Sequence, residues 1–345
     1  MLEKKIKLLI VDDSILFRET LAKFFANDKL IEVVDKASDP YEARDKIVAL
    51  RPDVITLDVE MPKMNGIQFL RKLIPQYPVP TVIVSSAPIK AFDALDAGAV
   101  DYVKKPMIKT PKDMEAFAAD LRLKILASSQ AKVIQKKAPV RTAVAHGNVI
   151  SNEALARNPQ TIIAMGASTG GTDALQTVLT SLPANIPPIV IVQHMPPGFT
   201  KMFADRLNKI CAVEIREAKD GDRLQNGLAL IAPGDYHMAL CKDARGYFVK
   251  IEYGEKVSSH RPSVDYLFNS VARVAGKNAI GVIMTGMGSD GADGMVKMHQ
   301  QGAYTIGQDK ETCVVYGMPM TAFMRGGCTV QAPLDKISKM ICDRL

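Results

Sequence analysis

A serine in a glycine-rich turn could carry nucleophilic chemistry. Ser168 stands in Gly166-Ala167-Ser168-Thr169-Gly170, which fits the pattern G-x-S-x-G and directly follows an apolar run. Glycines permit a tight turn from a strand into a helix, and the N-terminus of that helix favours an anion nearby. Such turns also bind nucleotide phosphates, but this one lacks the G-x-G-x-x-G spacing of a dinucleotide loop. The turn therefore favours catalysis by Ser168.

A serine nucleophile needs a base, and the base needs an acid that orients it. His194 ends the apolar run PIVIVQH, so in a parallel sheet it would lie at the same carboxyl edge as Ser168. Asp290 follows the run AIGVIMTG in the turn GMGSDGADG, whose glycines let the backbone approach closely. We therefore predict a triad of Ser168, His194 and Asp290. Asp293 is the competing acid in this turn, and we expect it to face the following helix.

The other histidines fit the role of base less well. His146 lies in a connecting segment and His299 in the middle of a predicted helix. His237 and His260 lie near a predicted pair of antiparallel strands, where they would face the substrate or serve the structure. The chain order Ser, His, Asp also differs from the order Ser, Asp, His of the α/β-hydrolases. The G-x-S-x-G pattern therefore does not place this domain in the α/β-hydrolase fold.

A second group of reactive side chains lies nearer the start of the chain. Asp12 and Asp13 follow the first apolar run, Asp58 ends VITLD, Ser85 ends TVIVS and Lys105 ends DYVKK. At the carboxyl edge of a parallel sheet these residues would converge. Clustered carboxylates attract a hard divalent cation, for which Mg²⁺ is the best match. The cation can neutralise phosphoryl oxygens while one carboxylate attacks, and the lysine and the hydroxyl can bind the phosphoryl group.

The elements that would position these groups alternate between strands and helices. From residue 7 to about residue 127, five apolar runs are separated by helix-compatible stretches, which predicts a parallel sheet with helices on both faces. A second alternation starts at TIIAMGAS and predicts a doubly wound, mostly parallel α/β domain. Within it, LALIAPGDYHMAL and YFVKIEY have Pro-Gly and Gly punctuation, so we expect a small antiparallel insert. The end, LDKISKMICDRL, has the pattern of an amphipathic helix.

Length and composition favour two globular domains. A chain of 345 residues is too long for one ordinary core, and 47% hydrophobic with 23% charged residues is a globular composition. Residues 128–159 are rich in polar and small residues with weak periodicity, which is typical of a flexible or partly helical connector. We therefore expect one domain over residues 1–127, a linker over 128–159 and a second domain over 160–345.

The net charge of +7 does not indicate nucleic-acid binding. Four basic residues fall between Ser128 and Asn148, where no acidic residue occurs, and no helix-turn-helix or zinc-finger pattern accompanies them. The five cysteines show no C-x-x-C spacing, so we expect them to be reduced. No apolar run reaches the roughly 18 residues of a membrane span, and the start lacks a cleavage site. We therefore expect a mature cytosolic protein without membrane insertion, and a monomer.

The first region resembles the receiver domain of two-component response regulators. The resemblance covers residues 5–126, and it includes, in order, the paired acids, the stretch D-x-x-M-P-x-M-x-G from Asp58 to Gly66, the hydroxyl and the pair Lys105-Pro106. It implies a flavodoxin-like α/β fold with a five-stranded parallel sheet. It also implies that a histidine kinase phosphorylates Asp58.

The same resemblance assigns roles to the neighbouring residues. It implies that Asp12 and Asp13 form the acid pocket, and that Mg²⁺ is bound by Asp13, Asp58 and the backbone carbonyl of Glu60. Lys105 would contact the phosphoryl group. The switch positions of the family match two further residues, Ser85 and Tyr102, although Tyr102 could instead be plain packing.

The second region resembles the catalytic domain of the chemotaxis protein-glutamate methylesterases, the CheB family. The blocks GASTGG, QHMPPGFT, IAPGDYHM, HRPSVDYLF, MTGMGSDGADGM and CVVYGMP occur in the order of that family. The resemblance implies the triad Ser168, His194 and Asp290. It also places Thr169 and Met287 beside the triad, where they would support the serine or form the oxyanion hole.

Together the two resemblances imply a regulated esterase of bacterial chemotaxis. It would hydrolyse glutamate γ-methyl esters on the cytoplasmic part of chemoreceptors, release methanol and deamidate specific glutamines. A chemotaxis histidine kinase would supply the phosphoryl group, the unmodified receiver would block the esterase cleft, and ester hydrolysis would need no metal. Two alternatives stay open: a receiver-linked esterase or amidase that acts on another protein, and a second domain that only binds a partner or a nucleotide.

Overall fold

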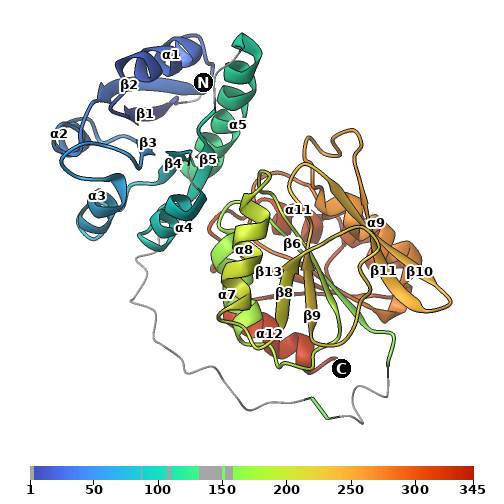
Figure 1. Ribbon diagram of the computed structural model, residues 1–345. Helices are drawn as coiled ribbons and strands as arrows, with labels where there is room; N and C mark the ends of the chain where they lie inside the picture. Colours follow the sequence, from blue (N-terminus) through green and yellow to red (C-terminus); the bar gives the residue numbers. More distant parts are fainter. Residues whose placement is uncertain (1–3, 87, 107–109, 132–149, 152–157) are drawn as a thin grey trace. The chain divides into compact units, whose positions relative to one another are not determined.

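The chain divides into two compact units, Met1–Pro139 and Val140–Leu345 (Figure 1). The computed structural model describes residues 4–86, 88–106, 110–131, 150–151 and 158–345. Most of the predicted linker, His146 included, lies outside these residues, so the predicted domain boundaries stay predictions. Among the residues that the structure describes, no helix combines the length and the apolar character needed to cross a membrane.

The first unit is a five-stranded parallel sheet in the order β2-β1-β3-β4-β5, which confirms the predicted fold class. Its strands are β1 (Ile6–Val11), β2 (Ile31–Ala37), β3 (Val54–Asp58), β4 (Thr81–Ser85) and β5 (Asp101–Lys104). Its helices are α1 (Ile15–Phe25), α2 (Pro40–Leu50), α3 (Gly66–Leu73), α4 (Pro88–Asp96) and α5 (Pro111–Ser129). In this flavodoxin-like order, β1 and β3 are neighbours at the centre of the sheet, where ligands bind beyond the carboxyl ends of the strands.

Capping residues begin the helices that follow the acidic strand ends of this unit. Ser14 accepts a hydrogen bond from Phe17 N at 3.3 Å and so starts α1. Asn65 accepts from Gln68 N at 2.9 Å and starts α3. Each cap satisfies a backbone N–H that has no partner inside the helix. The chain therefore enters α1 immediately after Asp12 and Asp13, and enters α3 after the short loop that follows Asp58.

The second unit is a seven-stranded sheet in the order β14-β13-β12-β6-β7-β9-β8, with a separate two-stranded hairpin, β10-β11. Its strands are β6 (Ile162–Ala167), β7 (Ile189–Gln193), β8 (Glu214–Glu217), β9 (Leu228–Ile231), β10 (His237–Asp243), β11 (Gly246–Glu252), β12 (Ala279–Ile283), β13 (Tyr304–Gln308) and β14 (Val330–Ala332). Its helices are α7 (Gly171–Thr180), α8 (Phe199–Asn208), α9 (Val264–Val274), the 3₁₀ turn η1 (Gly276–Asn278), α10 (Ala292–Gln300), α11 (Met318–Met324) and α12 (Leu334–Cys342).

Three neighbouring strands at the centre of the large sheet lead to the three predicted triad residues. β12, β6 and β7 lie side by side and run in parallel, with Ile283 opposite Gly166 and Ala167 opposite Gln193. From β6 the chain passes to β7 on one side and later to β12 on the other. This is the topological switch point, beyond whose carboxyl ends ligands bind in open α/β sheets.

The prediction of antiparallel strands was wrong for the run LALI. These residues form β9, which pairs in parallel with β7 and β8 and extends the large sheet. Antiparallel pairing joins β10 to β11, from His237 opposite Glu252 to Asp243 opposite Gly246. All residues of β9 are buried, as is typical of a parallel strand covered on both faces. The apolar run carried that signal, but the Pro-Gly that follows it suggested a hairpin.

Helix α9 joins the large sheet to the hairpin. Ser263 caps it, and Val264, Leu267, Phe268 and Val271 recur at helical spacing on its buried face. The helix packs against both α10 and β10, and Figure 1 shows it beside the hairpin. The core of the second unit is therefore built around the helix whose first turn faces the end of β12.

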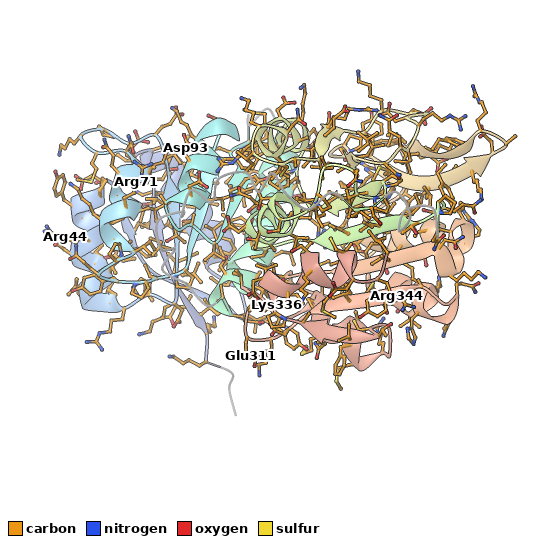
Figure 2. The ribbon with its side chains drawn as sticks, turned by 90° about the horizontal axis from the view of Figure 1, so that it is seen from below. Arg44, Arg71, Asp93, Glu311, Lys336 and Arg344 are labelled. Carbon is orange, nitrogen blue, oxygen red and sulfur yellow. The ribbon has the colours of Figure 1, made fainter. Side chains whose placement is uncertain are left out.

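Charged side chains cover the outside of both units, while apolar faces turn inward. Arg44 on α2 and Glu311 after β13 are exposed, and both are labelled among the side chains of Figure 2. Helix α12 buries Ile337 and Ile341 and packs against α7. The predicted amphipathic helix at the end of the chain is thus confirmed.

We predict that Phe268→Ala destabilises the second unit by about 3–5 kcal/mol, because it leaves a cavity where a fully buried ring now packs. Leu21→Ala in α1 should destabilise the first unit by about 2–5 kcal/mol for the same reason. Hydrogen exchange followed peptide by peptide across a denaturant series assigns each loss to a unit. Ile210→Ala, at a residue that is 38% exposed, is the control and should change stability by less than about 0.5 kcal/mol. A Phe268→Ala variant as stable as this control would contradict the packing.

Candidate functional site

The structure brings Ser168, His194 and Asp290 together at the carboxyl edge of the large sheet. Ser168 Oγ lies 3.1 Å from His194 Nδ1, and His194 Nε2 lies 2.8 Å from Asp290 Oδ2. Only 2% of Asp290 and 9% of the His194 side chain are exposed. The arrangement is that of a nucleophile, a base and an acid that orients the base.

The two nitrogens of the His194 ring have distinct partners. In trypsin-like proteases Nε2 faces the serine and Nδ1 faces the aspartate, whereas here Nδ1 faces Ser168 and Nε2 faces Asp290. An ionised carboxylate can only accept hydrogen bonds, so the contact with Asp290 assigns the ring proton to Nε2. The lone pair of Nδ1 is then directed at Ser168 Oγ, ready to take its proton.

The carboxylate of Asp290 is held at the N-terminus of α9. Oδ2 accepts from Val264 N at 2.7 Å, while Oδ1 accepts from Asp265 N at 3.0 Å and from Ser263 Oγ at 2.7 Å. The first backbone N–H groups of a helix have no partner within the helix, and the helix dipole favours an anion beside them. The acid of the triad is therefore fixed by three donors from α9 in addition to His194.

The neighbouring carboxyl groups of Asp290 and Asp265 have pKa values shifted in opposite directions. Burial alone would raise the pKa of Asp290, but the hydrogen bond and charge of His194, with the bonds from Asp265 and Ser263, lower it to about 2. Burial raises the pKa of Asp265 above its usual value. Asp265 Oδ1 also accepts from Gly294 N at 2.7 Å and so links the starts of α9 and α10. Asp290 thus stays ionised, as an acceptor for His194 requires.

The turn after β12 needs glycine because other residues lie against it. A Cβ on Gly286 would lie 2.8 Å from Ser168 Cβ, and one on Gly291 would lie 2.5 Å from Val264 Cγ1. The G-x-G-x-x-G spacing that is missing around Ser168 does occur at residues 286–291, where β12 leads into α10. The anion in this segment is the Asp290 carboxylate itself, and it is bound at the N-terminus of α9. Gly286 and Gly291 therefore support the triad because they let the turn after β12 lie close to Ser168 and to the start of α9.

Three buried polar residues that support the Ser168 turn were missed by sequence reasoning. Gln193 Nε2 donates to Ser168 O at 2.9 Å. Thr285 O accepts from Ser168 N at 3.0 Å, and Gln308 Oε1 accepts from Thr285 N at 2.8 Å. Gln193 and Gln308 end the apolar strands β7 and β13, and Thr285 follows β12 closely. The signal in the sequence that could have identified these residues is a polar residue at or just after the end of an apolar run.

The oxyanion hole cannot use the donor that trypsin-like proteases take from the nucleophile. Because Ser168 N already donates to Thr285 O, another donor must face the developing oxyanion. Thr169 is buried directly after the nucleophile, and its carbonyl accepts from Thr285 Oγ1 at 3.0 Å. Met287 follows Gly286, which lies against Ser168. Both residues are placed beside the triad, and their role in the oxyanion hole stays a prediction.

Two other histidines lie near the second unit's hairpin, and one of them touches the triad. The ring of His260 stacks on the ring of His194, with centroids 3.8 Å apart and planes inclined by 12°. His237 is buried, donates from Nε2 to Glu255 O at 2.8 Å and stacks on Tyr266. His237 therefore serves the structure, whereas His260 covers one face of the base.

The remaining candidates lie away from the base. His299 is in the last turn of α10, and its Nδ1 lies 3.4 Å from Thr305 Oγ1. Asp293 is exposed in the first turn of α10 and forms an ion pair with Arg325. Asp293 therefore faces a cation outside the triad, which leaves Asp290 as the acid in contact with His194.

In the first unit, Lys105 bridges two buried carboxylates. Its Nζ lies 2.7 Å from Asp12 Oδ2 and also bonds Asp58 Oδ2. One oxygen from each of Asp12, Asp13 and Asp58 lies within 4.8 Å of the others. Three carboxylates facing one lysine leave excess negative charge, and an all-oxygen donor set suits a hard cation such as Mg²⁺. The residues present therefore fit the predicted metal.

The protonation of this cluster follows from its burial. Burial raises the pKa of Asp12 to about 6, against the hydrogen bond from Lys105, and the charge of Asp58 acts in the same direction as burial. The pKa of Lys105 is raised, because its bonds to Asp12 and Asp58 outweigh the effect of burial. A nearby cation would favour the ionised form of Asp12.

The D-x-x-M-P-x-M-x-G stretch shapes the loop around Asp58. Asp58 Oδ1 accepts from Glu60 N at 2.9 Å. A Cβ on Gly66 would lie 2.4 Å from Asp58 O, so only glycine fits where α3 begins. The side chain of Glu60 turns outward to Lys90. The predicted metal ligand is the carbonyl of Glu60, and that assignment stays a prediction.

The predicted switch residues lie on β4 and β5. Ser85 is buried at the end of β4, and its carbonyl accepts from Lys105 N at 2.9 Å. Tyr102 is 3% exposed, and burial raises its pKa well above the usual value. Its ring packs near Phe92, with centroids 6.1 Å apart, and lies under Lys124 Nζ at 5.3 Å. Both residues are buried on neighbouring strands, and their switching role stays a prediction.

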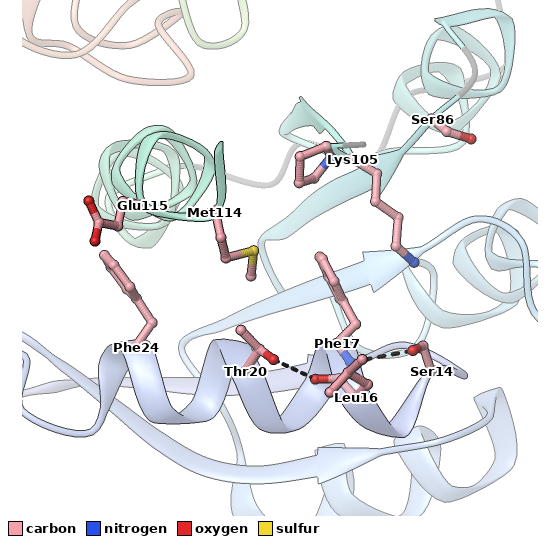
Figure 3. A pocket seen from close by; sticks show the side chains of 10 residues that line it. Ser14, Leu16, Phe17, Thr20, Phe24, Ser86, Lys105, Met114 and Glu115 are labelled. Carbon is pink, nitrogen blue, oxygen red and sulfur yellow. Dashed lines mark hydrogen bonds between the residues drawn. The ribbon is translucent and has the colours of Figure 1, made fainter. Parts of the chain in front are cut away.

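A cavity of about 660 Å³ opens beside Lys105 (Figure 3). It is lined from α1, α5 and the segments after β4 and β5 by Ser14, Leu16, Phe17, Thr20, Phe24, Ser86, Lys105, Pro106, Met114 and Glu115. Figure 3 shows Lys105 reaching toward Phe17, and its Nζ lies 4.6 Å from the centroid of that ring. The approach to the carboxylate cluster is therefore bordered by apolar side chains.

Two family models match the chain, one for each unit. The model described as response regulator receiver domain matches residues 8–116, and the model described as CheB methylesterase matches residues 163–341. The crystal structure of the Thermotoga maritima CheB methylesterase catalytic domain resembles the second unit. Its TM-score is 0.53 at 39% identity, and the match covers 54% of this chain and 98% of that chain.

Relatives of known name match over nearly the full length. The protein-glutamate methylesterase/protein-glutamine glutaminase of Syntrophotalea carbinolica is 49% identical, and the match covers 99% of this chain and 98% of that protein. The protein of the same name from Salmonella typhimurium is 45% identical, with 99% of this chain and 97% of that protein covered. The chain therefore belongs to the CheB methylesterase family, with a response regulator receiver domain ahead of its methylesterase domain.

Proposed function

We propose that this protein is a phosphorylation-controlled protein-glutamate methylesterase of bacterial chemotaxis. The observation that carries the proposal is the contact of Ser168 Oγ with His194 Nδ1 and of His194 Nε2 with Asp290, within a domain of the CheB family. The substrate is a glutamate γ-methyl ester on the cytoplasmic part of a methyl-accepting chemoreceptor. The products are the glutamate carboxylate, methanol and a proton, and the protein acts in the cytoplasm.

The triad divides ester hydrolysis into two steps. Ser168 Oγ attacks the γ-carbonyl carbon while His194 Nδ1 takes its proton, and the ring then gives that proton to the departing methoxide, which leaves as methanol. Water attacks the acyl-enzyme while His194 takes one of its protons, and that proton passes to Ser168 Oγ as the acyl group leaves. The released γ-carboxyl group gives its remaining proton to solvent. Asp290 holds the ring proton on Nε2 and stabilises the imidazolium that forms in each step.

The same steps convert a glutamine side chain to glutamate, with ammonia as the leaving group. An amide is attacked less readily than an ester, and its nitrogen must receive a proton before it leaves. His194 Nδ1 is placed to deliver that proton, because it lies beside the Ser168 oxygen. We therefore include deamidation of specific receptor glutamines in the proposed activity.

Regulation is proposed to begin at Asp58. The Asp58 carboxylate accepts a phosphoryl group from a chemotaxis histidine kinase, and Lys105 lies within reach to contact it afterwards. Asp13, Asp58 and the Glu60 carbonyl would hold Mg²⁺, which when bound neutralises phosphoryl oxygens. Ser85 would bond the phosphoryl group, and Tyr102 would take part in the resulting change of the receiver. That change would relieve the inhibition that the unmodified receiver exerts on the esterase.

Ser168→Ala should abolish methanol release from methylated receptor membranes, with a loss of at least about 10⁴-fold. The variant should also lose labelling by a fluorophosphonate probe, because the acylated oxygen is gone. Phosphorylation of Asp58 by a small phosphodonor should persist. Ser289→Ala removes an exposed hydroxyl from the turn after β12 and should keep full activity. Substantial turnover by Ser168→Ala would remove this serine from the mechanism.

Asp290→Asn should lower kcat by about 10³–10⁴-fold and leave KM nearly unchanged, because an amide no longer holds the ring proton on Nε2. Steady-state kinetics on a small ester measure both constants. Asp293→Asn is the matched control, since Asp293 lies in the same glycine-rich segment but is paired with Arg325. Equal losses in the two variants would argue against a specific role of Asp290.

Asp58→Asn should keep the basal esterase activity and lose its stimulation by a small phosphodonor, because the amide cannot accept a phosphoryl group. The measurement is the ratio of methanol release with and without the phosphodonor and Mg²⁺. Asp45→Asn, at an exposed carboxylate on α2, should keep the wild-type ratio. Stimulation of Asp58→Asn to the wild-type level would contradict control through this residue.

A further inference from the structure

Two exposed tyrosines form a small ridge on the second unit. Tyr236 is 44% exposed and Tyr253 is 70% exposed, and their rings meet edge to face with centroids 5.9 Å apart. Tyr236 lies between β9 and β10, and Tyr253 directly follows β11. We call these two side chains the tyrosine ridge. Large aromatic side chains left exposed in contact with each other are typical of surfaces that bind another molecule.

Arg261 fixes the position of the ridge. Its guanidinium lies over the Tyr253 ring at 4.0 Å from the centroid. It also forms an ion pair with Asp235 at 2.7 Å and donates to Gly254 O. The Arg261 side chain is only 12% exposed, so its positive charge interacts mainly with these neighbouring groups of the protein. The exposed part of the ridge is therefore aromatic and carries no charge of its own, and Arg261 restrains Tyr253.

Residues next to the ridge link it to the catalytic centre. His260 directly precedes Arg261, and its ring stacks on that of His194 at 3.8 Å. On the other side, a Cβ on Gly234 would lie 2.5 Å from the backbone of Pro196 and Pro197, which follow His194 closely. The segment that carries Tyr236 therefore contacts residues next to the catalytic base, and Tyr253 is linked to the base through Arg261 and His260.

We propose that the tyrosine ridge docks the protein substrate, by binding the segment that flanks the modified glutamyl side chain. The proposal rests on the proposed function, because a glutamyl ester that is part of a protein brings its neighbouring residues to the surface beside Ser168. The ridge lacks net charge, so it fits aliphatic side chains and backbone of that segment. A tyrosine side chain has few rotatable bonds, so it loses little conformational entropy on binding, and Arg261 already holds Tyr253 in place.

In this proposal the ridge contacts the segment beside the modified side chain, and only the triad contacts the reacting atoms. Loss of the ridge should therefore affect binding of protein substrate without affecting the chemical step. Tyr236→Ala and Tyr253→Ala should each raise KM for methylated receptor protein about tenfold, with kcat unchanged. Their kcat/KM for a small acetate ester should stay within about twofold of wild type, because that substrate has no flank. Tyr253→Phe should restore the wild-type KM, since it keeps the ring.

The control is Ile210→Ala, which removes an apolar side chain that is 38% exposed. Ile210 follows the end of α8, so it lies at the amino edge of the sheet, away from the triad, and its loss should leave both substrates unaffected. An unchanged KM for receptor protein in Tyr253→Ala, or an equal loss on both substrates, would overturn docking by the ridge. Wild-type protein that hydrolyses the small ester but releases no methanol from receptor protein would overturn the proposed function, and the docking proposal with it.

Discussion

The buried carboxylate of Asp290 depends on a helix that begins beside it. A charge removed from water costs several kcal/mol unless hydrogen-bond donors surround it. Three donors come from the Ser263 hydroxyl and the first two amides of α9, and the fourth comes from His194. The start of α9 and the turn after β12 must therefore meet, and Gly291 permits that approach. The orientation of the catalytic base thus follows from where one helix starts.

The first unit meets the same constraint with a side chain in place of a helix. Asp12 and Asp58 are buried at the ends of the adjacent strands β1 and β3. Lys105, which directly follows β5, bonds both carboxylates. A lysine compensates part of the charge and leaves room for a cation and a phosphoryl group. Asp290 has four hydrogen-bond contacts, whereas Asp58 accepts two from the residues that the structure describes, Glu60 N and Lys105 Nζ. The arrangement around Asp290 suits a carboxylate that stays ionised and unmodified, and the arrangement around Asp58 suits a carboxylate that is phosphorylated.

Much of the fold could be predicted because parallel sheets leave a plain pattern of buried strands and capped helices. Ser168, His194 and Asp290 could be proposed because each follows such a strand. The contact of Asp290 with α9 could not, since it joins segments whose distance depends on how the helix packs. The strand Leu228–Ile231 was assigned to the antiparallel insert because the Pro-Gly after it looked like a hairpin turn. Support by Gln193 and Thr285 also depends on strand order, which the local sequence does not contain.

The orientation of the His194 ring has a mechanical consequence. Nδ1 is bonded to the ring carbon that joins the side chain, so it lies on a shorter lever arm from the backbone than Nε2. A small rotation about the Cα–Cβ bond of His194 therefore displaces the atom that meets Ser168 less than the atom that meets Asp290. Restraint applied by Asp290 at the far end of the lever is correspondingly more effective. The proton-accepting atom is thus steadied twice, by its nearness to strand β7 and by the carboxylate at the opposite end of the ring.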